Sequence, residues 1–148
     1  MTFGHIDLVE RGLAIFDEIV IVIAHSVKKA PLFTTEERVQ LVRESFSNNP
    51  RVKIDVDDGL LVDYARKHHI KVIIRGLRAL SDFEYEFQMA TMNRRLYPEI
   101  QSIFLMSSDR FFFVNSTLVK EVFSHGGDIS ELVPPHTIRK LGEKLCSN

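Results

Sequence analysis

The chain has 148 residues, 45% of them hydrophobic and 26% charged, and a formal net charge of −1. This length suits one domain around one core, and the composition is that of an ordinary soluble globular protein. The charge argues against a nucleic-acid binder that depends on overall basicity, and no apolar run approaches the roughly 20 residues that span a bilayer. Cys146 has no cysteine to pair with, and the first residues lack a basic-then-apolar leader pattern, so we expect a cytoplasmic protein.

Apolar spacing and turn residues predict helices that alternate with strands. Residues 5–16 repeat apolar side chains at helical spacing, and the β-branched run at 19–24 predicts a strand buried on both faces of a parallel sheet. Thr34 with Glu37 forms a capping box that opens the next helix. The remaining predicted elements are a strand at 51–57, a short helix ending near His68, a strand at 71–74, a long helix opened by a second capping box (Ser81 with Glu84) and ending near Arg95, a strand at 100–106, a helix from Asn115 to Phe123 and a last helix at 136–145.

This alternation predicts right-handed βαβ crossovers, and so a single α/β domain over 1–148 with a mostly parallel sheet. The chain opens directly on a helix, with no strand ahead of it in the sequence. A phosphate-binding helix N-terminus is usually preceded by a strand and a tight loop, so this opening is unusual.

Two arginines, Arg75 and Arg78, directly follow the apolar run 72–74 and precede a helix signal. Ligands of open α/β sheets bind at the carboxyl ends of strands, and a guanidinium can hold phosphate oxygens in a bidentate fork. This pair therefore predicts a polyanion site. The alternative is that the arginines pair with acidic residues of the following helix, namely Asp82, Glu84 or Glu86. Glu86 could also accept hydrogen bonds from a ribose diol.

The first turn of the chain, Thr2-Phe-Gly-His5, has the composition of a second anion site. Gly4 permits close approach of a ligand to the backbone, and a helix N-terminus favours negative charge. His5 could donate a hydrogen bond to a phosphate oxygen. The alternative is an ordinary helix cap. Lys29, which follows the strand at 19–24, is either a point charge for phosphate or a solvated loop residue.

The segment 111–117 offers both apolar and hydroxyl groups. Ser116 and Thr117 at a helix start suit the outer phosphates of a nucleoside triphosphate, although Asn115 could equally be a plain N-cap. Phe111–Phe113 could supply apolar contact beside a base, but we expect at least two of the three rings in the core. The remaining histidines have no metal-ligand spacing and are treated as structural or surface residues: His25, His68, His69, His125 and His136.

Taken together, these residues resemble the family of bacterial phosphopantetheine adenylyltransferases over nearly the whole chain. The block RGLRA…DFEYE is the most specific part, whereas the (T/H)xGH motif marks the wider nucleotidyltransferase superfamily. The segments that carry the resemblance are TFGHIDLVERG, KKAPLFTTEERV, GLLVDYAR, IIRGLRALSDFEYEFQMATMNR and STLVKEV. It implies a Rossmann-like open parallel sheet with helices on both faces. It also implies adenylyl transfer from ATP to 4′-phosphopantetheine, which gives 3′-dephospho-CoA and pyrophosphate, with Mg²⁺ accompanying ATP and a homohexameric assembly.

The resemblance also implies roles for particular residues. His5 would stabilise the transition state and contact an ATP phosphate, whereas Lys29 and Arg75 would hold the phosphate of 4′-phosphopantetheine. Thr2 and Leu61 would complete the substrate-binding set, with Leu61 against the pantetheine arm. The implied ATP-binding set is His5, Gly76, Leu77, Arg78, Glu86, Phe111, Phe112, Phe113, Val114, Asn115, Ser116 and Thr117.

One feature departs from the family pattern. The family begins with a central strand that ends in a GTFDP loop, and here Met1 stands where that loop ends. We therefore expect the two strands that share this neighbour to have free backbone edges. Two alternative functions remain open. One is another small nucleotidyltransferase of the same fold, such as a glycerol-phosphate cytidylyltransferase or a nicotinamide-mononucleotide adenylyltransferase. The other is a truncated chain that binds coenzyme A without turnover.

Overall fold

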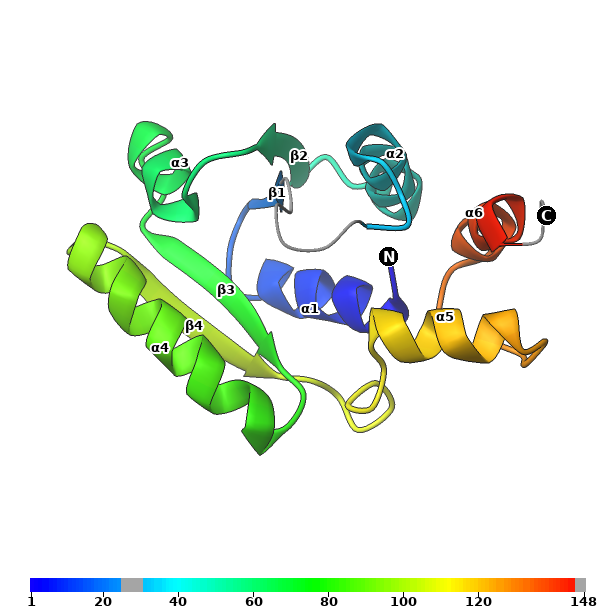
Figure 1. Ribbon diagram of the computed structural model, residues 1–148. Helices are drawn as coiled ribbons and strands as arrows, with labels where there is room; N and C mark the ends of the chain where they lie inside the picture. Colours follow the sequence, from blue (N-terminus) through cyan, green and yellow to red (C-terminus); the bar gives the residue numbers. More distant parts are fainter. Residues whose placement is uncertain (25–30, 146–148) are drawn as a thin grey trace.

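The computed structural model describes residues 1–24 and 31–145, without the side chains of Leu80 and Ser81. Helices and strands alternate through this part of the chain, as the apolar pattern predicts (Figure 1). None of these helices is long and apolar enough to cross a membrane. The elements are α1 (Phe3–Leu13), β1 (Ile19–Ala24), α2 (Thr35–Phe46), β2 (Val52–Asp57), α3 (Leu61–Lys67), β3 (Val72–Leu77), α4 (Leu80–Leu96), β4 (Gln101–Met106), α5 (Ser116–Ser124) and α6 (Pro135–Leu145).

The strands form two parallel pairs rather than one continuous sheet. β1 pairs with β2, with Ile19 opposite Val52, and β3 pairs with β4, with Val72 opposite Gln101. Among the described residues, neither β1 nor β3 has a second strand beside it. This confirms the expectation of free backbone edges. The alternating helices and parallel strands otherwise have the arrangement of a Rossmann-like open α/β fold.

Helices cover both faces of β3. Alternate side chains of a strand point to opposite sides, so Gly76 and Ile73 lie on opposite faces. A Cβ added at Gly76 would lie 3.3 Å from a methyl of Leu8, which belongs to α1. On the other face, Ile73 is buried in a cluster with Val62 and Ala65 of α3. Figure 1 shows α1 and α4 on either side of β3.

Helix α1 bridges the two strand pairs. A Cβ at Gly12 would lie 2.6 Å from Cδ1 of Ile19 in β1 and 3.0 Å from Cδ1 of Ile74 in β3. Since Gly12 lies beside Ile74 and Leu8 beside Gly76, α1 runs antiparallel to β3. The N-terminus of α1, which carries His5, therefore lies at the carboxyl end of β3.

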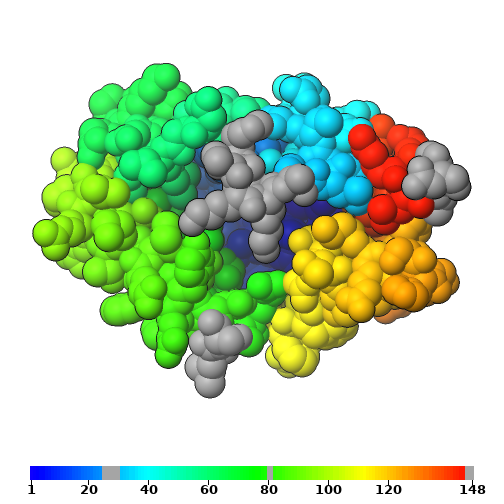
Figure 2. All heavy atoms as spheres, viewed as in Figure 1, coloured from blue at the N-terminus to red at the C-terminus, as the bar shows by residue number. Residues whose placement is uncertain are grey.

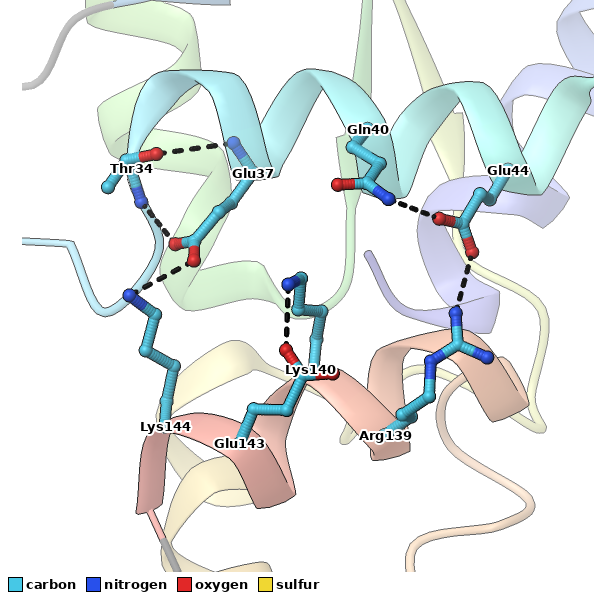
Figure 3. A network of polar contacts seen from close by, with 8 residues as sticks. All are labelled: Thr34, Glu37, Gln40, Glu44, Arg139, Lys140, Glu143 and Lys144. Carbon is cyan, nitrogen blue, oxygen red and sulfur yellow. Dashed lines mark hydrogen bonds and ion pairs between the residues drawn. The ribbon is translucent and has the colours of Figure 1, made fainter. Parts of the chain in front are cut away.

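The C-terminal part of the chain forms a second core beside α2. Its buried residues are Val114, Val119, Ile129, Val133 and Leu141. Figure 3 shows how α6 is joined to α2 at the surface, by Lys144 to Glu37 at 3.0 Å and by Arg139 to Glu44 at 3.3 Å. The predicted capping box at the start of α2 is confirmed. The Glu37 amide donates to Thr34 Oγ1 at 3.2 Å, and the Thr34 amide donates to a Glu37 carboxylate oxygen at 2.9 Å.

Several predicted boundaries are wrong. The strand predicted at 71–74 continues to Leu77, because its pairing with β4 extends to Met106. Arg75 therefore lies within the strand, opposite Phe104, and only Arg78 follows its end. The capping box of Ser81 with Glu84 does not start α4, whose N-cap is Ala79. Helix α1 covers 3–13 instead of 5–16, because its N-cap is Thr2.

Candidate active site

A cavity of about 820 Å³ lies between β1 and β3. It is lined by β1 from Ile19 to Ile23, by β3 from Val72 to Arg75 and by residues of α1. Beside this cavity, β1 is only partly buried from Ile19 to Val22, buried at Ile23 and exposed at Ala24, whereas the sequence predicts burial on both faces. In Figure 2, dark-blue residues of α1 lie at the bottom of a depression between the green β3–α4 segment and the yellow segment before α5.

The carboxyl end of this cavity gathers three of the predicted site residues. His5, from the first turn of α1, Leu61, from the first turn of α3, and Arg75, from β3, all line it. The carboxyl ends of strands are where open α/β sheets bind their ligands. One ligand that carries both a phosphate and an uncharged chain can be bound at this end. Arg75 and His5 can contact its phosphate, and Leu61 can contact its uncharged chain.

The imidazole of His5 is oriented by Thr2, a buried residue. Nδ1 of His5 accepts the backbone N–H of Thr2 at 3.2 Å and lies 2.8 Å from its hydroxyl oxygen. An amide can only donate, so Nδ1 is the unprotonated nitrogen and the Thr2 hydroxyl donates to it as well. In the neutral ring the proton therefore sits on Nε2, which leaves that N–H for a ligand.

His5 is neutral at physiological pH. Burial, with smaller contributions from the N-terminal amine of Met1 and from the guanidinium of Arg78, lowers its pKa from 6.5 to about 4. The exposed surface of His5 opens into the concave cavity, so the ring is accessible to a ligand although protein surrounds it on most sides. Such a ring can stabilise developing negative charge by donating a hydrogen bond, without carrying a charge itself.

Arg75 is held by Glu86 of α4. Its Nε and Nη2 donate to the two carboxylate oxygens of Glu86 at 2.6 and 2.7 Å. These hydrogen bonds raise the pKa of Arg75 further above its ordinary value, so the guanidinium is charged throughout the physiological range. The ion-pair alternative considered for Arg75 is therefore realised, with Glu86 as the partner.

Arg78 also pairs with a carboxylate. Its Nε donates to Asp82 at 3.0 Å, and Nη1 donates to the backbone carbonyl of Val114 at 3.4 Å. Arg78 thereby connects the first turn of α4 to the loop before α5, close enough to His5 to influence its pKa. Between the two arginines, Leu77 is buried, and Gly76 faces α1.

At the start of α5 the plain N-cap is realised. The Asn115 side chain accepts the backbone N–H groups of Thr117 at 3.0 Å and Leu118 at 2.8 Å. The backbone N–H groups of Thr117 and Leu118 are thus already hydrogen-bonded within the protein. The side chains of Ser116 and Thr117 are exposed, so their hydroxyl groups remain accessible.

The expectation for the three phenylalanines is wrong. Phe111 packs beside Phe3, with ring centroids 6.3 Å apart, and against the C-terminal core. Phe112 and Phe113 are 55% and 48% exposed. The segment is a turn, so consecutive side chains diverge and one ring alone reaches the core. The rings of Phe112 and Phe113 are therefore accessible to a ligand, close to the contact between Arg78 and Val114.

The rest of the expected site is distributed as follows. Lys29 lies outside the described residues, and Val114 is buried in the C-terminal core. Residues 1–24 and 31–145 contain no group of three or more His, Cys, Asp or Glu side chains that could hold a metal ion. Sequence reasoning missed the role of Thr2 in orienting His5. The signal was present, because the two residues have capping-box spacing, with histidine in the place of the usual Glu or Gln.

The chain is similar to known proteins over most of its length. Residues 1–122 match the model of the family described as cytidylyltransferase-like. The chain is 51% identical over 145 residues to a protein of Thermotoga neapolitana named phosphopantetheine adenylyltransferase, with 98% of this chain and 90% of the relative covered. Proteins of the same name from Cupriavidus taiwanensis (50% over 146 residues; 99% and 91% covered) and Anaeromyxobacter dehalogenans (49% over 145 residues; 98% and 88% covered) are similarly related.

Proposed function

Because the chain belongs to the phosphopantetheine adenylyltransferase family, we propose that it transfers the adenylyl group of ATP to 4′-phosphopantetheine. The products are 3′-dephospho-CoA and pyrophosphate, and the reaction is a step of coenzyme A biosynthesis, which we place in the cytoplasm. The observation that carries this proposal at the level of the site is the convergence of His5, Leu61 and Arg75 on one end of a single cavity.

The reaction is an in-line displacement at phosphorus. An oxygen of the 4′-phosphopantetheine phosphate attacks the α-phosphorus of ATP, the bond from that phosphorus to the β-bridging oxygen breaks, and pyrophosphate leaves. A phosphate monoester has its second pKa near 6, so the nucleophile is largely a dianion at neutral pH and needs no general base. The protein therefore acts by alignment and by stabilising charge.

Each residue of the site has a part in this reaction. Arg75, together with Lys29, holds the attacking phosphate. The Nε2–H of His5 donates to an α-phosphate oxygen, where negative charge builds as the five-coordinate phosphorus forms. Leu61 packs against the pantetheine arm. The outer phosphates of ATP are held by Arg78 and Ser116, with Gly76, Leu77 and Thr117 beside them, and the exposed rings of Phe112 and Phe113 border the base.

Magnesium enters as part of the ATP substrate. The described residues offer no cluster of acidic or imidazole ligands for a resident ion, and Mg²⁺ commonly keeps several waters while binding substrate phosphates. In this proposal the ion would come bound to the ATP phosphates and would supply charge neutralisation for the leaving pyrophosphate.

The proposed assembly is a homohexamer, and α4 offers a surface for it. Several large apolar side chains of this helix are exposed, and exposed apolar surface can mark a site of protein contact. Size-exclusion chromatography with light scattering tests this, with six copies per particle expected and a monomer contradicting the proposal. The exposed residues are Phe83, Tyr85, Phe87, Met89, Met92 and Leu96.

Initial rates of pyrophosphate release test the function itself. The chain is assayed with MgATP and 4′-phosphopantetheine, with MgATP and nicotinamide mononucleotide, and with MgCTP and glycerol 3-phosphate. We expect pyrophosphate release from MgATP with 4′-phosphopantetheine and none with the other two substrate pairs. Release only with another acceptor would identify a different nucleotidyltransferase, and binding of CoA without any release would support a non-catalytic chain.

A further inference from the structure

Arg75 and Glu86 occupy different positions relative to the main cavity. Arg75 lines both this cavity and a smaller one of about 160 Å³ between α3 and α4, whereas Glu86 lines only the smaller one. The side chain of Glu86 is 12% exposed and that of Arg75 is 43% exposed. Glu86 therefore binds the Arg75 guanidinium on the side that faces away from the main cavity.

Within residues 1–24 and 31–145, the Arg75 side chain is hydrogen-bonded to Glu86 alone, so the rest of the guanidinium can donate to another anion. A guanidinium has five N–H groups, and the pair with Glu86 uses Nε–H and one N–H of Nη2. Both N–H groups of Nη1 and the second N–H of Nη2 belong to the other edges of the planar group. A phosphate in the main cavity can accept these without displacing Glu86.

From this geometry we propose that Glu86 is a positioning residue for the phosphate acceptor: it fixes the Arg75 guanidinium so that its free N–H groups face the 4′-phosphopantetheine phosphate. This inference rests on the proposed function. The resemblance assigns Glu86 to ATP, whereas here both of its carboxylate oxygens are engaged by Arg75. Glu86 stays in place when substrate binds, because a largely buried carboxylate without its partner would be costly.

Pre-organisation gives this arrangement a measurable effect. A free arginine side chain loses rotamer freedom when it binds a phosphate, and the pair with Glu86 has already restricted that freedom. Loss of the pair should therefore weaken binding of the phosphate acceptor by about 3- to 10-fold, the effect expected from releasing one rotamer-rich side chain. It should leave the affinity for ATP within about twofold.

The test compares Glu86→Gln with Glu84→Gln, a matched control that removes the same charge from an exposed position of α4. Calorimetry gives the Kd of 4′-phosphopantetheine and of ATP for each, and steady-state rates give the two KM values and kcat. We expect Glu86→Gln to raise Kd and KM for 4′-phosphopantetheine alone, and Glu84→Gln to behave as the original chain. Glu86→Asp, which keeps the charge, should recover part of the loss.

A double variant separates action through Arg75 from direct action. If Glu86 acts through Arg75, adding Glu86→Gln to Arg75→Ala weakens 4′-phosphopantetheine binding no further. Additive losses, or a rise in the Kd of ATP with that of 4′-phosphopantetheine unchanged, would overturn the proposal while the enzyme assignment stands. If the unsubstituted chain does not bind 4′-phosphopantetheine, the proposed function fails, and this inference fails with it.

Discussion

The hydroxyl of Thr2 lies 2.8 Å from Nδ1 of His5, and the backbone N–H of Thr2 donates to the same atom at 3.2 Å. Both contacts hold the ring in the tautomer that is protonated on Nε2. Thr2 is 5% exposed, so these hydrogen bonds are partly shielded from competing water. The first residues of the chain thus supply both a hydrogen-bond donor, Nε2–H of His5, and its orientation.

Replacement of His5 should impair catalysis far more than binding. We expect His5→Ala to lower kcat at least 10²-fold, about the effect of one lost oxyanion donor, with smaller changes in the Kd values of the substrates. Steady-state kinetics checks this, with His125→Ala, at the exposed end of α5, as the control. A near-normal kcat for His5→Ala would remove His5 from the mechanism.

Loss of the orienting hydroxyl should have a smaller effect. Thr2→Val removes the side-chain hydrogen bond to Nδ1 but keeps the backbone one. A neutral hydrogen bond contributes about 0.5–1.5 kcal/mol, so kcat should fall roughly 2- to 10-fold. Thr2→Ser keeps the hydroxyl and should retain activity. Equal kcat values for the valine and serine variants would show that the hydroxyl does not orient His5.

The lowered pKa of His5 predicts a particular response to pH. The folded chain keeps the ring neutral down to a pKa of about 4, whereas the unfolded chain protonates it near 6.5. Between these values the unfolded state binds more protons, so this group's contribution to stability is present above pH 6.5 and is lost as the pH falls toward 4. An NMR titration of the His5 ring measures the pKa directly, and a value at or above 6.5 would contradict the geometry described here.

Arg75 should contribute mainly to binding of the phosphate acceptor. Hydrogen bonds to charged groups contribute about 1.5–3 kcal/mol, so Arg75→Ala should weaken 4′-phosphopantetheine binding by roughly 10- to 150-fold. Binding of ATP should change less. Calorimetry with each ligand makes the comparison, and an unchanged affinity for 4′-phosphopantetheine would contradict the assignment.

The position of α6 should owe its stability to burial in the C-terminal core rather than to its ion pairs with α2. Leu141 is 2% exposed, and Leu141→Ala should cost about 2–5 kcal/mol of unfolding free energy. Lys144→Ala, which removes the partly exposed ion pair with Glu37, should cost less than about 1 kcal/mol. Urea unfolding of the two variants compares them, and similar losses for both would show that the ion pairs contribute more than expected.

Much of this fold could be predicted from local sequence. The continuous β-branched run gave β1 its correct bounds, and Thr34 with Glu37 located the start of α2. The end of β3 could not be predicted, because it depends on how far the pairing with β4 continues. The start of α4 was misplaced because Ala79, which offers no capping side chain, is its N-cap. A single domain over 1–148 stays a prediction.

The ion pairs of the candidate site could not be predicted from the sequence. Arg75 and Glu86 are 11 residues apart, on a strand and the helix that follows it. The sequence offered Asp82, Glu84 and Glu86 as partners and could not choose among them, because the choice depends on how α4 lies across β3. The exposure of Phe112 and Phe113 likewise depends on a turn that has no periodic signal.

A crystal structure of the chain with 3′-dephospho-CoA is the most direct test of the central claim that His5 and Arg75 act at the two phosphates that the reaction joins. We predict that His5 Nε2 and the Arg75 guanidinium both lie within about 3 Å of oxygens of the product's diphosphate bridge. A product bound with its diphosphate outside the carboxyl end of the cavity between β1 and β3, beyond reach of either side chain, would contradict the account.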